Sequence, residues 1–204
     1  MKLVHGIWIP DGDTTFAKVL QRHGGEYQLN RYEEALPHIK RRRVALDIGA
    51  HIGMYTRHMV RHFQLVHAFE PMPDNFECLE MNTQGFGNVH NHHCAVGAVK
   101  SRCEPLGNAG KSVSWKMMPK HDGIISVVAL DDCFTNTFVD FIKIDVEGME
   151  HDVLLGAEEI IRKHKPVVLI EEKFDATRAT SKYLTSVGMI CAWRKKNDYL
   201  FIWC

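Results

Sequence analysis

The chain has 204 residues, 45% of them hydrophobic, and its 25 basic and 25 acidic side chains give a formal net charge of zero. This length and apolar content suit one ordinary domain with a full core, and the zero net charge argues against a nucleic-acid-binding class. The six cysteines form no C-x-x-C pair, which argues against a zinc or disulfide framework and favours free thiols in a reducing compartment.

Targeting signals are absent from the sequence as given. No apolar run approaches the ~18 residues of a membrane span. The apolar stretch near the N-terminus is too short for a signal peptide, because Pro10 and Asp11 interrupt it. We therefore expect a cytoplasmic protein without a membrane-spanning segment, and the sequence sets no oligomeric state.

The first part of the chain predicts irregular structure followed by a buried strand. Residues 1–29 contain several glycines and predict short strands or loops with one helical turn. Residues 31–39 predict a helix that Pro37 limits. Residues 44–49 are apolar on both faces, as in a buried parallel strand, and residues 54–63 predict a helix.

The middle of the chain repeats this alternation and then interrupts it. Residues 65–71 predict a second strand, residues 72–84 a helix that opens with Pro73, and residues 88–97 a third strand. Residues 98–130 lack a helical period, and residues 125–130 predict a strand in a local hairpin.

The last part predicts two further strands, their helices and a closing hairpin. Strands are expected within 138–148 and at 166–172, helices at 151–164 and 179–188, and a hairpin at 189–203 around "KKND". Alternating strands and helices predict an α/β fold with a doubly wound, Rossmann-like parallel sheet, to which the hairpin adds an antiparallel strand. We expect residues 44–204 to form this domain and residues 1–43 to be an N-terminal extension.

The stretch "VALDIGAHIGMY" (44–55) predicts a nucleotide-binding turn at the end of the first strand. Its G-x-x-x-G spacing, Gly49 to Gly53, does not match the G-x-G-x-x-G dinucleotide fingerprint, and no G-K-S/T follows, so a P-loop is excluded. Asp47 has the wrong charge for a pyrophosphate but suits an ammonium group. Glu70, at the end of the second strand, could accept both hydroxyls of a ribose. S-adenosylmethionine satisfies both acids.

Several motifs together resemble the FkbM-type methyltransferases. They are "DIGAHIGMYT", "FEPMPDNFECLEMN", "CAVGA", "ALDD" and "DFIKIDVEGMEHDVLLGAEEII", followed by "PVVLIEE". The resemblance covers about residues 44–172, and the terminal hairpin fits the sheet of class I methyltransferases. It implies methyl transfer from S-adenosylmethionine, commonly to a hydroxyl of a sugar or another small molecule.

The resemblance also implies roles for individual cofactor-site residues. The methionine-side loop would contain Asp47, Gly49, Ala50, His51 and Gly53. Glu70 would bind the ribose, Met72 would lie against the adenine, and Cys94 and Ala95 would line the adenine edge. The alternative is that Asp47 and Glu70 only cap helices, but two acids at adjacent strand ends favour a common ligand.

The segment "DVEGMEH" places a group of acids after the fourth strand. Methyl transfer to a hydroxyl needs an acceptor held in line and a group that takes its proton, so Asp145 and Glu147 are candidate catalytic residues. Asp145 also leaves the strand at the cofactor edge. Lys143 lies on the same face as Asp145 and needs a buried partner, Asp145 or Glu171. The alternative is a structural network of ion pairs, and for Glu150 and His151 that reading is preferred.

The sequence offers two candidate metal sites, and neither is preferred. In "HNHHC" (90–94), alternation puts His90 and His92 on one face and His93 on the other, which leaves too few ligands. Asp145 with Glu171 resembles the magnesium site of catechol-type O-methyltransferases, but no third oxygen ligand is evident, so the cofactor prediction is S-adenosylmethionine without a metal.

The rival functions use other acceptors. Ribose 2'-O-methylation of RNA is the main alternative, with Asp145 and Lys173 at plausible positions and "KRRR" (40–43) available for phosphate, but its final Glu is missing and the net charge is neutral. Base methylation needs Asp/Asn-Pro-Pro-Tyr/Phe, which "DVEG" lacks. A module that binds the cofactor without chemistry is the non-enzymatic alternative.

We expect a small, saccharide-like acceptor. The segment "VHGIWIPDGDTTF" (4–16) could cover its pocket through Trp8 and Phe16 with Asp11 and Asp13, or it could be an extra edge strand with a surface loop.

Overall fold

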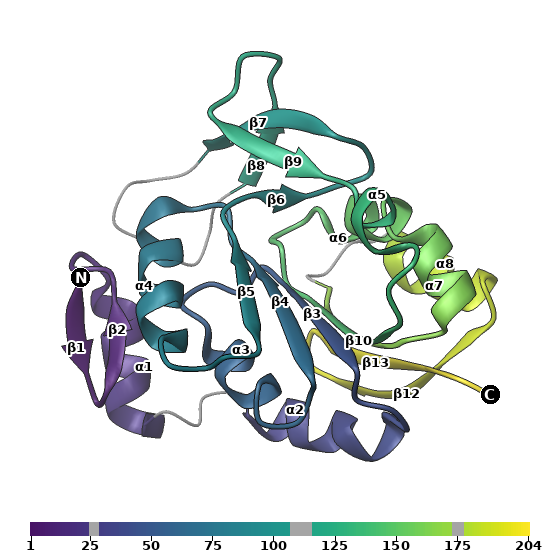
Figure 1. Ribbon diagram of the computed structural model, residues 1–204, viewed down its shortest axis with the longest axis horizontal. Coiled ribbons are helices and arrows are strands. Elements are labelled where there is room, and N and C mark those ends of the chain that lie inside the picture. Colours follow the sequence, from purple (N-terminus) through teal and green to yellow (C-terminus); the bar gives the residue numbers. More distant parts are fainter. Residues whose placement is uncertain (25–28, 107–115, 173–177) are drawn as a thin grey trace.

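A seven-stranded sheet forms the centre of the computed structural model, which describes residues 1–24, 29–106, 116–172 and 178–204 (Figure 1). Its strand order is β12-β13-β11-β10-β3-β4-β5. Neighbouring strands are parallel from β11 to β5, whereas β13 is antiparallel to both β11 and β12. The strands are β3 (Val44–Ile48), β4 (Leu65–Phe69), β5 (Val89–His92), β10 (Val139–Ile144), β11 (Val167–Glu171), β12 (Met189–Lys195) and β13 (Asp198–Trp203). The predicted doubly wound, Rossmann-like sheet, with its closing antiparallel hairpin, is confirmed.

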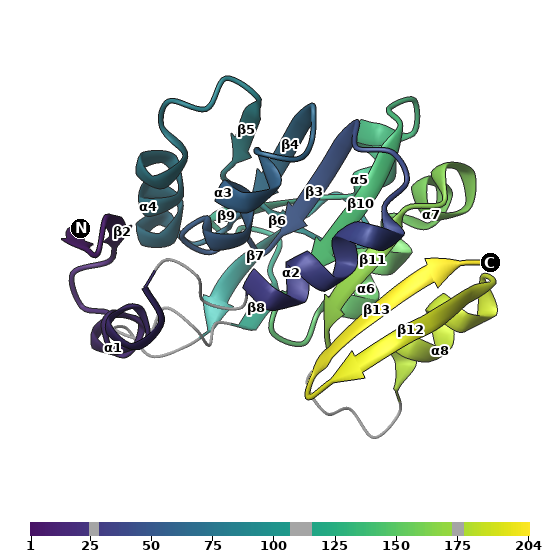
Figure 2. The same ribbon diagram turned by 90° about the horizontal axis from the view of Figure 1, so that it is seen from below.

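Helices cover both faces of this sheet because its strands are apolar on both sides (Figures 1 and 2). On one face, Ala45 and Phe141 belong to a core with residues of α2 (Leu29–Ala35) and α3 (Met54–Met59), and α4 (Pro73–Thr83) lies beyond them. On the other face, Leu46 and Ile142 pack with α5 (Leu130–Phe134), α6 (Glu150–Leu155), α7 (Glu158–His164) and α8 (Ala179–Ser186).

The N-terminal extension is more ordered than its sequence indicates. A hairpin of β1 (Lys2–Val4) and β2 (Ile7–Ile9) precedes α1 (Thr14–His23), which is far longer than the single predicted turn. Apolar residues of β2 and α1 share a core with Ile52 and Cys78. The hairpin is fastened beside α4, because the N–H and carbonyl of Trp8 both bond to the side chain of Asn82 (2.7 and 2.8 Å).

The predicted third strand, 88–97, is interrupted. The chain leaves the central sheet after His92 and forms β6 (Ala95–Val96), the first strand of a second sheet with β7 (Ser101–Leu106), β8 (Lys116–Pro119) and β9 (Ile125–Val128). This sheet has the order β6-β9-β7-β8 and stands at the top of Figure 1. The strand predicted at 125–130 is β9, which pairs antiparallel with β7 and parallel with β6.

The helix predicted at 151–164 is two helices, α6 and α7, which meet at Gly156. The cause is a backbone contact with the second sheet: a Cβ on Gly156 would lie 2.0 Å from the carbonyl oxygen of Gly97. A side chain therefore cannot occupy this position, and the chain bends where the two glycines meet. The predicted helix 54–63 is also shorter and ends at Met59.

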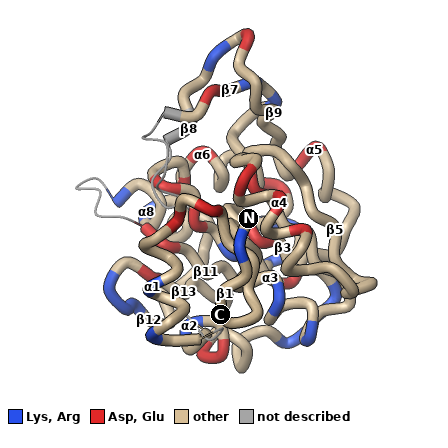
Figure 3. Tube along the Cα trace, turned by 90° about the vertical axis from the view of Figure 1, so that its left-hand side faces the viewer, with Lys and Arg blue, Asp and Glu red and all other residues tan. Residues whose placement is uncertain are grey.

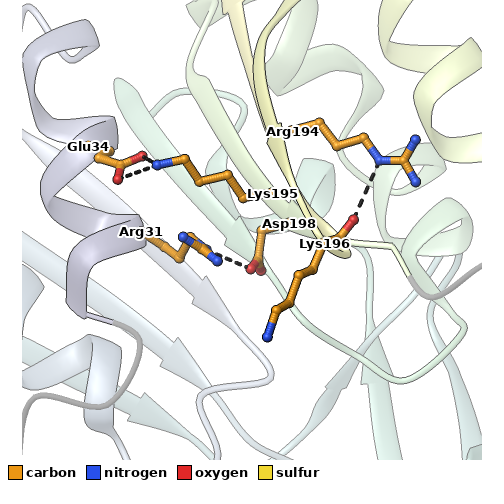
Figure 4. A network of polar contacts seen from close by, with 6 residues as sticks. All are labelled: Arg31, Glu34, Arg194, Lys195, Lys196 and Asp198. Carbon is orange, nitrogen blue, oxygen red and sulfur yellow. Dashed lines mark hydrogen bonds and ion pairs between the residues drawn. The ribbon is translucent and has the colours of Figure 1, made fainter.

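Ion pairs join α2 to the C-terminal hairpin (Figure 4). Arg31 donates to Asp198 at 3.0 Å, and Lys195 pairs with Glu34. The basic run "KRRR" (40–43) lies in the connection between α2 and β3 and is not helical. Its last residue, Arg43, forms a bidentate pair with Asp140, while residues 40–42 are exposed. In the described residues, no helix has the length and apolar character needed to cross a membrane.

Candidate functional site

A row of acidic side chains crosses the carboxyl edge of the central sheet. Strand register aligns Asp47 with Lys143 and Glu171 with Asp198, and Asp145 directly follows β10 beside β11. Because side chains alternate along each strand, these four acids and Lys143 all lie on the face that α2 and α3 cover. Figure 3 shows acidic positions gathered in the middle of the molecule, between the labels of α4, α6 and α8.

Asp47 is fully enclosed at the base of this row, with 0% of its surface exposed. Its Oδ2 accepts a hydrogen bond from the hydroxyl of Thr56 at 2.6 Å, and its Oδ1 lies 3.4 Å from the ammonium of Lys143. The sequence prediction placed an ammonium group of a ligand beside Asp47. In the structure, the ammonium beside it belongs to Lys143.

Lys143 connects the glycine turn to the acids. Its Nζ donates to the carbonyl of Gly49 at 3.0 Å, lies 3.6 Å from Oδ2 of Asp145 and sits 5.0 Å from the ring centre of Tyr55. Burial alone would lower the pKa of Lys143, but the charges of Asp47 and Asp145 outweigh it and the pKa is raised. Lys143 therefore stays an ammonium ion and stabilises the turn.

The turn itself has the backbone that the sequence predicted. Gly49 and Gly53 have φ angles of 77° and 86°, and His51 has 54°. A Cβ on Gly49 would lie 1.9 Å from the carbonyl oxygen of Asp145, so the turn packs directly against the end of β10. Gly49 and Ala50 both donate to the carbonyl of Phe69, which fixes the turn to the end of β4.

Glu70 lies at the end of β4 and points into the same turn. Its Oε2 accepts from the N–H of His51 at 2.9 Å, and its Oε1 accepts from Met72 N–H at 3.0 Å and from the Asn75 amide at 3.4 Å. Burial raises the pKa of Glu70 to about 7, although these hydrogen bonds oppose the shift. A carboxylate accepts about four hydrogen bonds. One further donor therefore fits, and a second would replace the long contact with Asn75.

The residues predicted to surround an adenine are only partly brought together. Met72 packs against a small apolar group that contains Ala95 and residues of the second sheet. Cys94 instead packs against the core of the opposite face, where burial raises the pKa of its thiol to about 11.

Asp145 and Glu171 form the open part of the acidic row. The side chain of Asp145 is 27% exposed. Burial raises the pKa of Glu171 well above its ordinary value, and the adjacent charge and hydrogen bond of Asp145 add to the shift. On the next strand, burial also raises the pKa of Asp198, although its bond to Arg31 opposes this.

The other acids after β10 have distinct surroundings. Glu147 has a φ of 58° and is partly buried at a turn. Glu150 is buried, and its Oε1 accepts from the N–H of Gly148 at 2.8 Å, so it holds that turn in place. The ring of His151 packs edge-on against Tyr183, which agrees with the structural reading of these two residues.

Four residues that the sequence does not mark also contribute to the site: Thr56, Asn75, Tyr55 and Asp198. Thr56 and Tyr55 lie in the first turn of α3, which faces back towards β3. Asn75 lies in the first turn of α4. Asp198 could have been found only from the antiparallel pairing of β13 with β11.

The histidine-rich strand forms stacked rings. His67 stacks on both His90 and His92, at centroid distances of 5.3 and 5.2 Å, while His93 stacks on Phe76. The predicted faces of His90, His92 and His93 are therefore confirmed. Within residues 1–24, 29–106, 116–172 and 178–204, no group of three or more His, Cys, Asp or Glu side chains is arranged to hold a metal ion.

A comparison with models of known protein families finds one match. Residues 47–201 match the model of a family described as the methyltransferase FkbM domain. Methyltransferase 1 of Beauveria bassiana (strain ARSEF 2860) is 28% identical over 144 residues, which cover 56% of this chain and 58% of that protein. The chain thus spans less than two thirds of the length of this curated relative.

Solved structures show the same fold. The methyltransferase FkbM from Methylobacillus flagellatus KT aligns with a TM-score of 0.56 and 22% identity over 79% of this chain and 44% of that chain. An rRNA methylase from Streptococcus thermophilus aligns with a TM-score of 0.51 and 10% identity over 84% and 92%. At these identities the likeness concerns the fold alone.

Proposed function

Because the chain belongs to the family of FkbM-domain methyltransferases, we propose that it transfers the methyl group of S-adenosylmethionine to a hydroxyl of a neutral, saccharide-like small molecule. The observation that carries this proposal is the pair formed by the Gly49–Gly53 turn and Glu70, which are joined by the bond from His51 N–H to the carboxylate. Such a turn at the carboxyl ends of adjacent parallel strands is the usual place for a nucleotide in this class of fold.

The donor set fits the cofactor. Glu70 has room for one ribose hydroxyl, and for a second if Asn75 gives way. Gly49, Ala50, His51 and Gly53 would form the methionine side, Met72 with Ala95 would line the adenine, and Cys94 would lie behind them. When bound, S-adenosylmethionine supplies a methyl group on a positively charged sulfur. Asp47, held by Thr56 and Lys143, would act mainly by supporting the turn.

We propose that the side chain of Asp145 receives the acceptor. It is the more open partner of Lys143, because its side chain is 27% exposed and that of Asp47 is fully buried. A carboxylate here can accept the acceptor hydroxyl's hydrogen bond, hold its oxygen in line and take its proton. Glu147, at the following turn, is a second candidate for orienting the acceptor.

The charge of this edge favours a neutral acceptor over RNA. Four carboxyl groups face two cations, Lys143 and Arg31, so a phosphate would meet net negative charge. The exposed residues 40–42 precede β3 and therefore lie at the opposite, amino edge of the sheet. Lys173, which the RNA alternative requires, lies outside the described residues.

The N-terminal extension contributes to the turn through α1. Phe16 packs edge-on against the ring of His51 at 5.2 Å, and Asp13 caps α1 by accepting from Phe16 N–H. We therefore propose that α1, more than the hairpin that carries Trp8, borders the acceptor pocket. Deleting residues 1–16 would also remove buried side chains of the core, so Phe16→Leu is the cleaner test. Unchanged transfer in this variant would place the acceptor elsewhere.

Calorimetry with S-adenosylhomocysteine tests the cofactor half. We expect micromolar affinity, about −7 to −8 kcal/mol, and loss of most of it in Glu70→Ala. Glu77→Ala, an exposed acid on α4, is the control. Equal affinity in the two variants would remove Glu70 from the site.

The acceptor half is tested with labelled S-adenosylmethionine and two panels, neutral saccharides and RNA. We expect label in the saccharides, and a fall of about 10²- to 10⁴-fold in Asp145→Asn with cofactor affinity retained. A smaller fall is expected in Glu147→Gln. Label in RNA alone would support the 2'-O-methylation alternative.

A further inference from the structure

The carboxyl groups of Asp145 and Glu171 meet side by side at the open end of the acidic row. Ile144 of β10 pairs with Ile170 of β11, so the residues that follow them are neighbours on parallel strands. Glu171 is also aligned with Asp198 of β13, so three carboxyl groups lie side by side on adjacent strands, where a negative charge on one disfavours a negative charge on the next. Neighbouring carboxyl groups can hydrogen-bond to one another only if one of them carries a proton, because an ionised carboxylate has no donor.

The neighbouring charges decide which group carries that proton. The ammonium of Lys143 forms ion pairs with Oδ1 of Asp47, at 3.4 Å, and with Oδ2 of Asp145, at 3.6 Å. On the other side, Asp198 is held by Arg31 at 3.0 Å. Glu171 lies between Asp145 and Asp198, and no ion pair in the described part of the chain includes it.

The carboxyl groups on both sides of Glu171 agree with this assignment, and only Lys143, among the described residues that act on it, opposes it. Asp145 from β10 and Asp198 from β13 disfavour a negative charge on Glu171, and Lys143 favours it only weakly by comparison. Tyr55 from α3 faces the same acids and is itself held neutral, because burial raises its pKa well above the ordinary value. Glu171 is therefore the partner that keeps the proton.

We propose that Glu171 is a positioning residue, which donates a hydrogen bond to one oxygen of Asp145 and so leaves the other oxygen free to accept the hydroxyl of the acceptor. This inference rests on the proposed function. As the acceptor oxygen bonds to the methyl carbon, the carbon–sulfur electron pair goes to sulfur and the hydroxyl proton goes to Asp145. Glu171 keeps its own proton throughout and prevents Asp145 from turning towards β11.

The first test does not depend on transfer activity. Carbon-13 NMR of glutamate carboxyl groups, followed against pH in the whole protein, should show one titration above neutrality that disappears in Glu171→Gln. Glu70 gives a separate transition near 7 and is assigned with Glu70→Gln. In Asp145→Asn the Glu171 transition should move to lower pH, because a neighbouring charge is gone. Titration of Glu171 in the ordinary acidic range would overturn the proposal.

A magnesium titration separates a shared proton from a shared metal. We expect no change in the Glu171 carboxyl signal when Mg²⁺ is added at neutral pH. A saturable shift that also releases a proton would show that the pair is a metal site, and the positioning role would then be wrong.

Transfer to an acceptor found in the saccharide panel gives the second test. Wild type should lose rate at alkaline pH as Glu171 ionises. Glu171→Gln keeps an N–H donor, so it should keep the neutral-pH rate within about threefold and should not show that alkaline fall. Glu171→Ala should lower kcat by roughly 10- to 100-fold, the usual effect of a hydrogen bond to a charged group, with unchanged S-adenosylhomocysteine affinity.

The two tests fail in distinguishable ways. If no acceptor is methylated but the NMR transition is present, the protonated pair of Glu171 and Asp145 is supported, and the proposed saccharide-like acceptor is wrong. If Glu171→Ala transfers at the wild-type rate with the wild-type pH profile, Glu171 has no positioning role.

Discussion

Replacing Lys143 with Met should destabilise the fold strongly, because it leaves the buried carboxylate of Asp47 without its cation. The ammonium lies 3.4 Å from Oδ1 of Asp47, and these side chains are only 7% and 0% exposed. At an effective dielectric constant of about 20, two unit charges at this distance attract by about 5 kcal/mol. Desolvation offsets part of this attraction, but removing one partner of a buried pair typically costs ~3–5 kcal/mol.

Urea denaturation at pH 7 measures this loss. For Lys143→Met we expect a free energy of unfolding lower by about 3 kcal/mol or more, and a Tm lower by roughly 6–12 °C for a chain of this size. Lys120→Met is the matched control, because Lys120 pairs with Glu104 at 2.5 Å while 46% of its side chain is exposed. Exposed pairs contribute ~0–1 kcal/mol, so this variant should be nearly neutral.

The double variant Lys143→Met with Asp47→Asn tests the cause. If the unpaired charge is what destabilises, the second substitution should recover at least about 1.5 kcal/mol of the first loss. A loss below about 1 kcal/mol in Lys143→Met, or strictly additive losses in the double variant, would refute the reasoning.

Three further predictions concern the rest of the site and its support. Glu70 binds a proton more tightly in the folded state, with its pKa raised from 4.5 to about 7, so the free energy of unfolding should fall as pH rises through that window, and urea titrations of Glu70→Gln should show a flatter profile. Gly49→Ala places a Cβ 1.9 Å from a backbone oxygen and should cost roughly 4 kcal/mol or more, whereas Gly148→Ala, strained but open, should cost about 1–2 kcal/mol in the same assay. Arg43→Met leaves Asp140 without its bidentate partner and should cost about 2 kcal/mol by calorimetric melting, and a Tm within 2 °C of wild type would contradict that.

The parts of the fold that sequence predicted correctly are those in which local pattern and tertiary packing agree. The strands at 44–49 and 166–172 are apolar on both faces, which occurs where helices cover both sides of a parallel sheet. The hairpin around "KKND" has a turn with Lys196 at φ 57°, between two strands that pair antiparallel. In these segments no distant contact changes the outcome.

The errors arise where a distant contact decides. The pattern of 151–164 is helical throughout, but the meeting of Gly156 with Gly97 breaks it, and no local signal reveals a partner some sixty positions away. The strand at 88–97 likewise divides because Ala95 and Val96 pair with β9 rather than with β4.

In the candidate site, too, local sequence predicted the position of a residue but not its distant partner. Strand ends placed Glu70 and Asp145 correctly at the carboxyl edge, because parallel strands bring their ends together. The partners of Asp47 could not be read in the same way. An acid at a strand end looks identical whether it faces a ligand or the ammonium of Lys143, and only the register of β3 with β10 distinguishes the two.

The contact between Gly156 and Gly97 also limits how this protein can be altered. Because two backbones touch there without any side chain between them, the second sheet and the junction of α6 with α7 cannot shift separately. A chimera that exchanges residues 93–129 for those of a relative, in order to change acceptor preference, would have to carry a compatible helix junction as well. Residues 93–129 and the α6–α7 junction must therefore be exchanged together, although more than twenty residues separate residue 129 from Gly156.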